Sequence, residues 1–130
     1  MIEFHLDSRS GVAPYLQLVH QVKQALRLGM LSPGDQLPTM REVVAQLAIN
    51  PNTVFKAYRE LEREGLVESR PGQGTFVRRA LAGPELASHE ALRRSLVNWL
   101  REAYQAGLDE ESIVALFTST LHHTNKEALV

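Results

Sequence analysis

The sequence predicts a mainly α-helical fold with a small β-hairpin, followed by a two-helix C-terminal unit. Two observations carry this prediction. Apolar residues recur at helical spacing along most of the chain, and a pair of short strand-like segments flanks Pro71-Gly72-Gln73-Gly74. With 130 residues, of which 44% are hydrophobic, the chain is long enough for one small domain plus an appendage.

The composition excludes several classes of protein. The chain has no cysteine, so nothing indicates a disulfide framework, a thiolate metal site or a cysteine nucleophile. No apolar run is long enough to span a membrane and the N-terminus has no signal-peptide pattern, so we expect a cytoplasmic protein without a membrane partner. Residues 1–79 hold ten Lys and Arg against eight Asp and Glu, and residues 80–130 hold four against seven. This mild asymmetry permits a DNA partner without requiring one.

The first segments combine an extended stretch with a helix. Apolar residues alternate with polar ones between positions 2 and 6, which predicts a brief edge strand before the turn residues 7–11. Pro14 then opens a helix, and Gly29 is expected just beyond its C-terminal end. The apolar face of this helix would consist of Tyr15, Leu18, Val19, Val22, Ala25 and Leu26.

Two further helices are predicted close together in the chain. Thr39-Met40-Arg41-Glu42 matches the S/T-x-x-E capping box, and the helix that it starts extends to Leu47. After the short connection Ala48-Ile49, Asn50 can cap a second helix and Pro51 suits the first helical position. A short helix, a tight turn and an amphipathic second helix form the helix-turn-helix arrangement, although any small helical hairpin would show the same pattern.

The second of these helices, residues 50–64, has two contrasting faces. Its apolar stripe consists of Val54, Ala57, Tyr58 and Leu61. Its opposite face, at about 100° per residue, holds Asn52, Lys56, Arg59 and Arg63. An amide can read adenine and cations can hold phosphates, but an ordinary surface helix with solvated charges has the same composition.

A β-hairpin is predicted after this helix, which ends at Gly65. Residues 66–70 and 75–77 have the pattern of short strands, and the two glycines between them supply the positive φ that a tight turn needs. A hairpin directly after a helix-turn-helix is a wing, whose tip could lie against the DNA backbone or the minor groove. The alternative is a hairpin that only covers the core.

The C-terminal part of the chain predicts two amphipathic helices, residues 84–106 and a last helix with Asp109 as its N-cap. Two such helices cannot hide both apolar faces against each other, so we expect them to pack against the same pair in a second copy. The expected dimer interface consists of Leu92, Leu96, Trp99, Leu100, Ile113, Leu116, Phe117 and Leu121. The chain should thus divide into a winged helix-turn-helix DNA-binding domain (1–79), a linker (80–84) and a helical dimerisation region (85–130).

In these features the chain resembles the GntR family of transcription regulators. The short helical tail and the segment Asn50-Pro51-Asn52-Thr53-Val54 resemble its YtrA branch, in which the C-terminal part is a two-helix dimerisation unit. The resemblance implies a sequence-specific DNA-binding regulator, expected to be a repressor, that binds a pseudo-palindromic operator as a homodimer. The matching segments are residues 14–18, 33–42, 52–54, 57–62, 64–66 and 72–77.

The resemblance also implies roles for particular residues. Arg41 matches an arginine that contacts DNA from the second helix. Asn52 and Thr53 match the polar pair at the start of the recognition helix, and Gly72 matches the glycine of the wing tip. Together with the outward cations and neighbouring polar residues, the expected DNA-binding set is Thr39, Arg41, Asn52, Thr53, Lys56, Arg59, Arg70, Gly72 and Gln73.

Three positions depart from the family pattern. Pro51 stands where many relatives have a base-reading arginine, and Phe55 and Gln73 occupy positions that are often basic. An operator sequence therefore cannot be carried over from relatives. Phe55 could touch a thymine methyl group or pack beside the turn, and packing is the favoured interpretation.

Other functions fit the sequence less well. One branch of the family is fused to a pyridoxal-phosphate aminotransferase-like domain, but Lys126 is the only lysine after the linker and no phosphate-binding glycine loop is near it. We therefore expect neither enzyme activity nor a cofactor. A metal-responsive regulator would have to use the histidines, which lack any H-x₃-H or H-E-x-x-H spacing. These histidines are His5, His20, His89, His122 and His123.

Two further questions stay open at this point. A winged helix can serve as a protein-interaction module, but such a module would not need the cationic face of residues 50–64. An effector small molecule is a further partner that the sequence does not identify. The short tail has little room for an enclosed pocket, and core packing is the favoured use of Trp99 and Tyr104.

Overall fold

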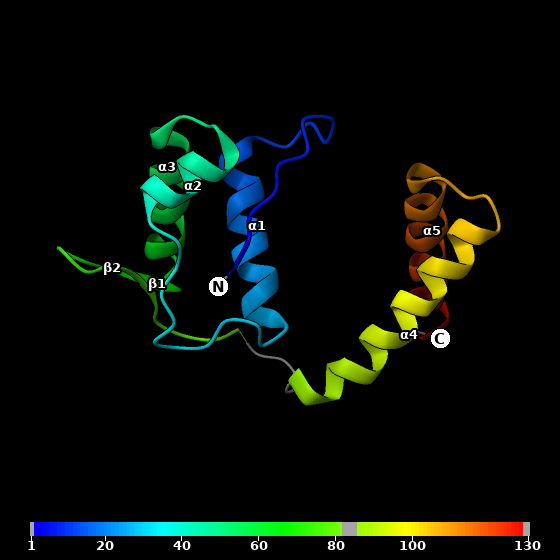
Figure 1. Cartoon of the computed structure of the whole chain (residues 1–130). Helices are drawn as coiled ribbons and strands as arrows, with labels where there is room; N and C mark the ends of the chain where they lie inside the picture. The colour runs from blue at the N-terminus through cyan, green and yellow to red at the C-terminus, as the bar shows by residue number, and fades with distance from the viewer. Residues whose placement is uncertain (1, 82–85, 129–130) are drawn as a thin grey trace. The chain divides into compact units, whose positions relative to one another are not determined.

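The computed structural model describes residues 2–81 and 86–128, with side chains described within 2–81 and 89–125. The fold is mainly helical with a two-stranded antiparallel hairpin, as predicted (Figure 1). By its contacts the chain forms two compact units, Met1–Leu86 and Ala87–Val130. The elements are α1 (Pro14–Arg27), α2 (Met40–Leu47), α3 (Pro51–Arg63), β1 (Val67–Arg70), β2 (Gly74–Val77), α4 (Leu86–Gln105) and α5 (Glu110–Ala128).

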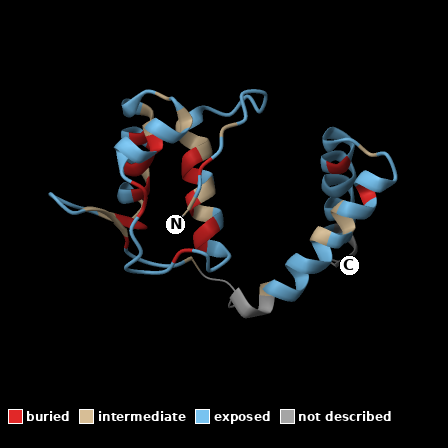
Figure 2. Ribbon diagram, viewed as in Figure 1, coloured by how far each residue is buried: buried red, intermediate tan, exposed pale blue. Residues whose placement is uncertain are grey.

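The core of the first unit lies between α1 and α3. Each of these helices has one continuous apolar face at helical spacing, and each buries that face against the other elements. Figure 2 marks buried residues in red along both helices. The predicted apolar stripe of α3 is thereby confirmed, and only its opposite face remains in contact with solvent. The fully buried side chains include Leu18, Val22, Leu26, Val54 and Leu61.

Local hydrogen bonds mark both ends of α2. Thr39 Oγ1 accepts the backbone N–H of Glu42 at 3.1 Å, and Glu42 Oε1 accepts the backbone N–H of Thr39 at 3.4 Å. These bonds confirm the predicted capping box. At the other end, Ala48 adopts the left-handed conformation with φ of 53°, and its N–H donates to the Val44 carbonyl. Ala48 therefore carries the turn between α2 and α3.

Replacing Ala48 by glycine should raise the free energy of unfolding by up to about 1 kcal/mol. A non-glycine residue in the left-handed region costs about 1–2 kcal/mol, and the greater freedom of glycine in the unfolded chain offsets part of this gain. Urea denaturation measures the change. As a control, Ala45→Gly places glycine inside α2 and should lower stability by about 1 kcal/mol. An Ala48→Gly protein less stable than the original would show that the turn is not strained.

α3 is tied to the segment that precedes α2. The Tyr58 hydroxyl donates to the Pro38 carbonyl oxygen at 2.6 Å in a buried setting. Burial, together with the nearby charge of Glu42, raises the pKa of Tyr58 well above its usual value. The hydroxyl therefore stays protonated as a donor, and this bond helps to set the angle between α2 and α3.

The hairpin is attached to the domain along one strand. β1 and β2 pair antiparallel, with Val67 opposite Val77, and each strand agrees with its predicted range to within one residue. The segment before α2 continues the pairing, because the Leu37 N–H donates to the Thr75 carbonyl at 2.9 Å and the Val77 N–H donates to the Asp35 carbonyl at 2.7 Å. The sequence did not predict this attachment, which gives the hairpin a defined direction relative to α3.

The predicted edge strand near the N-terminus is wrong. Residues 2–7 form no strand. Gln21 of α1 holds them instead, because its Nε2 donates to the His5 carbonyl at 2.7 Å and its Oε1 accepts the His5 N–H at 3.1 Å. Phe4 is buried in the core. The apolar alternation thus reflects packing onto the domain and not pairing with another strand.

α4 and α5 form the second unit. The predicted helix start at Pro84 and most of the predicted linker 80–84 lie outside the described residues. α5 begins as predicted, because Asp109 Oδ1 accepts the Ser112 N–H at 2.8 Å. Hydrogen bonds from Ser112 lower the pKa of Asp109, so this cap stabilises the fold above the usual pKa of the carboxyl and weakens as the pH falls. Among the described residues, no helix is both long and apolar enough to cross a membrane.

Candidate nucleic-acid interface

The solvent-facing side of α3 brings polar, cationic and aromatic side chains together. Because the apolar stripe is buried, the opposite face is exposed along the whole helix. Four of the exposed residues are those expected from the sequence, and Phe55 joins them in the middle of the face. The exposed residues on this face are Asn52, Phe55, Lys56, Arg59, Glu62 and Arg63.

The two asparagines at the start of α3 have different surroundings. Asn50 Oδ1 accepts the backbone N–H of Asn52 at 2.8 Å, so Asn50 caps the helix as predicted. Within the described part of the chain, the side-chain amide of Asn52 makes no hydrogen bond. The adjacent Thr53 is half-buried. Asn52 thus presents both a donor and an acceptor to solvent without a structural role at the helix start.

The cations of α3 differ in how strongly acidic groups hold them. The Lys56 ammonium lies 4.0 Å from the ring centroid of Tyr15, and the Arg59 guanidinium lies 5.6 Å from that of Phe55. Neither is in an ion pair with any described residue. Arg63, by contrast, hydrogen-bonds Glu60, which lowers the pKa of Glu60. Lys56 and Arg59 are therefore the cations of this helix that are available to an external anion.

α2 contributes two of the expected residues. Arg41 is exposed in the first turn of the helix and, among the described residues, has no ion-pair partner. The Thr39 hydroxyl is committed to the cap, because it accepts from the Glu42 N–H and donates to Glu42 Oε1 at 3.0 Å. Arg41 is consequently the residue of this pair whose side chain can reach a ligand without disturbing the helix start.

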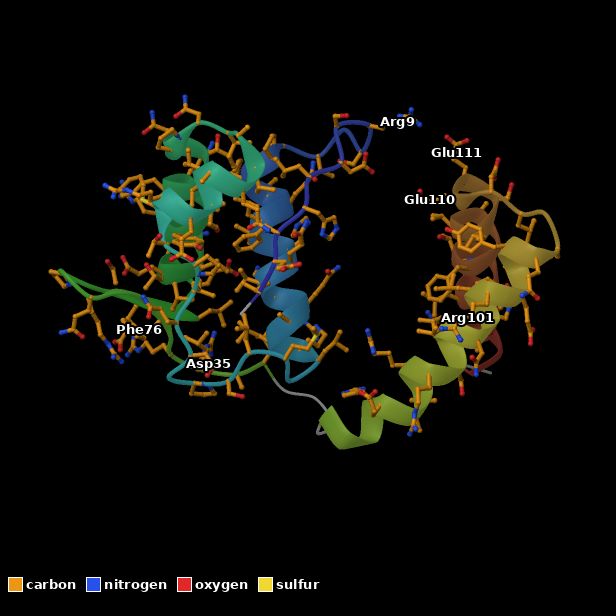
Figure 3. All side chains as sticks on the ribbon, viewed as in Figure 1. Arg9, Asp35, Phe76, Arg101, Glu110 and Glu111 are labelled. Carbon is orange, nitrogen blue, oxygen red and sulfur yellow. The ribbon has the colours of Figure 1, made fainter. Side chains whose placement is uncertain are left out.

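The hairpin carries the remaining expected residues. Arg70 Nη2 lies 2.7 Å from Glu68 Oε1, and its guanidinium lies 4.2 Å from the ring centroid of Phe76, which is labelled in Figure 3. Gly72, with φ of 73°, forms the turn, and the carbonyl of Gln73 accepts from Gln36 Nε2 at 3.2 Å. The turn at Gly72 and the bond from Gln36 thus hold the tip of the hairpin in place. Arg70 is already paired with Glu68.

A shallow hollow of about 240 Å³ joins α2, α3 and the hairpin, and the sequence analysis did not predict it. Phe55 is 48% exposed there, so the favoured interpretation that it packs beside the turn describes at most half of its surface. The side of α3 on which Phe55 lies could have been predicted from its position in the sequence. It lies three residues after Asn52 and four before Arg59, which places it on the outward face of the helix. The lining residues include Met40, Phe55, Arg59, Ser69 and Thr75.

The second unit leaves much of its apolar surface uncovered. Ile113 and Ala103 are buried between α4 and α5, and Trp99 and Leu100 are half-buried. Most of the remaining expected interface residues line an open groove of about 440 Å³. In the described part of the chain, no cluster of three or more His, Cys, Asp or Glu could hold a metal ion. The groove is lined by Leu96, Trp99, Leu116, Phe117, Thr120, Leu121 and Thr124.

Comparison with known protein sequences finds relatives over most of the chain. The family model described as "Bacterial regulatory proteins, gntR family" matches residues 14–77. The HTH-type transcriptional repressor YtrA of Bacillus subtilis (strain 168) is 35% identical over 113 residues, which cover 83% of this chain and 84% of that protein.

Solved structures agree with this likeness. A transcriptional antiterminator from Listeria monocytogenes EGD-e is 27% identical with a TM-score of 0.57, covering 92% of this chain and 90% of that one. AraR(DBD) in complex with operator ORX1 is 26% identical with a TM-score of 0.52, covering 58% of this chain and 95% of that one. The second likeness shows that the N-terminal fold of this chain is one that is found on operator DNA.

Proposed function

The chain belongs to the gntR family of bacterial regulatory proteins, and on this premise we propose that it is a transcription repressor that binds a pseudo-palindromic operator as a homodimer. Membership makes it a DNA-binding regulator and not an enzyme. The observation that carries the proposal is the outward face of α3, where the free amide of Asn52 lies on the same side as the unpaired cations Lys56 and Arg59. A regulator of this kind would act in the cytoplasm.

α3 is the proposed recognition helix, with its first turn in a major groove. The Asn52 amide matches the donor and acceptor on the adenine edge, so it is the proposed base reader. Arg41 contributes a base or phosphate contact from α2, and Lys56 and Arg59 hold backbone phosphates. Thr53 is half-buried and is assigned a phosphate contact beside the helix start.

The hairpin is the proposed wing. Gly72 and Gln73 at its tip would approach the minor groove or the backbone. Arg70 would add a phosphate contact by leaving its ion pair with Glu68 and binding the DNA backbone. Both side chains of this pair are exposed, so the pair can separate. Thr39 supports the interface through the cap that positions Arg41.

A homodimer would follow from the apolar surface of the second unit. An exposed apolar groove favours association, and a closed two-fold pair is the commonest arrangement of identical subunits. Two copies of α3 related by a two-fold axis would read two half-sites of opposite direction, which is why a pseudo-palindrome is proposed. The proposed interface comprises Leu92, Leu96, Trp99, Leu100, Leu116, Phe117 and Leu121, with Ile113 supporting it from within.

Selection of bound duplexes from a library of genomic fragments at moderate salt tests this function. The expected result is enrichment of a pseudo-palindrome that competes with random DNA at least about 1000-fold better, the lower end of the range for specific DNA-binding proteins. Binding to every fragment alike, or to none, would refute sequence-specific DNA binding.

Arg59→Ala should weaken binding to the selected duplex and to random DNA by similar factors. Arg59 is proposed to hold a phosphate, so its loss should reduce the slope of log K against log salt by about one unit per protomer. Titration at several salt concentrations measures this slope. Arg27→Ala, which removes the same charge from the end of α1, is the matched control and should leave the slope unchanged. An Arg59→Ala slope equal to that of the control would remove Arg59 from the interface.

A further inference from the structure

We propose that Phe55 contacts the C5-methyl group of a thymine, and that the operator of this chain therefore requires a T·A pair within about two base pairs of the adenine read by Asn52. The inference rests on the proposed DNA binding by α3. It deepens that function, because it assigns a base preference to Phe55. The other exposed side chains on the outward face of α3 are polar or charged.

Phe55 is a large apolar side chain that the core does not use. It is 48% exposed, whereas the four residues of the apolar stripe of α3 are buried. Its neighbours on the outward face are Asn52, one turn earlier, and Arg59, one turn later. A phenyl ring in this position gains free energy if a ligand covers it with another apolar group.

The surroundings of Phe55 orient the ring without covering it. The guanidinium of Arg59 lies 5.6 Å from the ring centroid, within the range of roughly 6 Å over which a cation attracts an aromatic face. Met40, the first residue of α2, is 36% exposed and lines the same hollow as Phe55. Ring and thioether thus form a small apolar spot, which is bordered by hydroxyl groups, the Arg59 guanidinium and the Glu62 carboxylate.

The DNA major groove offers one apolar group to such a spot, the methyl group of thymine. The positions that carry Asn52 and Phe55 are three residues apart, so their Cβ atoms lie about 5–6 Å from each other. Successive bases of a strand are about 3.4 Å apart along the axis. Phe55 should therefore meet a thymine within about two base pairs of the position that Asn52 reads.

Replacement of single thymines by deoxyuridine tests the proposal, because dU keeps every hydrogen-bonding group of dT and lacks only the methyl. The probe is the duplex that the protein selects from the genomic library, with each dT replaced in turn. At one position per half-site, dU should weaken binding about fourfold, as expected for one buried methyl group. At the other positions the affinity should stay the same.

Phe55→Ala should bind the dT and dU duplexes equally, with a thermal midpoint close to that of the original protein because the side chain is half-exposed. Met30→Ala removes an exposed apolar side chain beyond the end of α1 and should keep the fourfold preference. If Phe55→Ala still prefers dT, or if no dU weakens binding of the original protein to its selected duplex, the proposal is wrong while the DNA-binding function stands. If no duplex is selected at all, the function itself fails.

Discussion

Phe117→Glu should convert the proposed homodimer into a monomer and weaken operator binding about 100-fold or more. Phe117 lines the apolar groove of the second unit and is 45% exposed. A carboxylate there would be buried in the proposed interface without a partner. The free energy needed to bury an unpaired charge is much larger than the free energy that an apolar contact contributes. A monomer would also lose the gain of about 10²–10⁴ that comes from linking two binding modules. Sedimentation equilibrium measures the assembly, and fluorescence anisotropy measures the affinity for the selected duplex.

Val114→Glu is the matched control for this change. Val114 is on the same helix and is 56% exposed, but it does not line the groove. The variant should remain dimeric and bind the operator like the original protein. Circular dichroism should show unchanged helix content in both variants. A dimeric Phe117→Glu protein with normal affinity would place the self-association of this chain at another surface.

Asn52→Ala should cost about 1–3 kcal/mol on the operator, which corresponds to a loss of affinity of roughly 5- to 150-fold. The side-chain amide has no hydrogen bond within the described part of the chain, so its removal should leave the folded structure and non-specific binding intact. Binding to a set of duplexes with every base at each position should show that discrimination is lost at one position per half-site. This pattern separates a base reader from a residue that holds phosphates.

Asn50→Ala provides the control two residues earlier. Asn50 Oδ1 caps α3, so its loss should lower the free energy of unfolding by about 1 kcal/mol. Discrimination between bases should persist in that variant. If Asn52→Ala instead weakened binding to operator and random DNA equally, the amide would have no part in base recognition, and Arg41 and the wing would have to supply it.

Local patterns in the sequence predicted every helix and the hairpin. Helical spacing of apolar residues, the Thr39–Glu42 capping box, the Asn50 cap and the Gly72 turn act within a few residues of one another, so their consequences can be inferred before the chain is folded. The same reasoning failed at residues 2–7. An alternation of apolar residues indicates one buried side, but it does not distinguish pairing with a strand from packing onto a helix.

In the candidate interface, too, some features follow from the local sequence and others from the tertiary structure. The sequence alone determined that one side of α3 is apolar and that Asn52 and the cations occupy the other, because helical geometry sets these positions. The pairings that hold two of the cations are also local, because Arg63 bonds Glu60 three residues earlier and Arg70 bonds Glu68 two residues earlier. Only the tertiary structure decided that Phe55 is left exposed on the outward face of α3. Phe55 stays exposed because α2 and the hairpin approach α3 without covering it, and that approach depends on backbone hydrogen bonds between segments far apart in the chain.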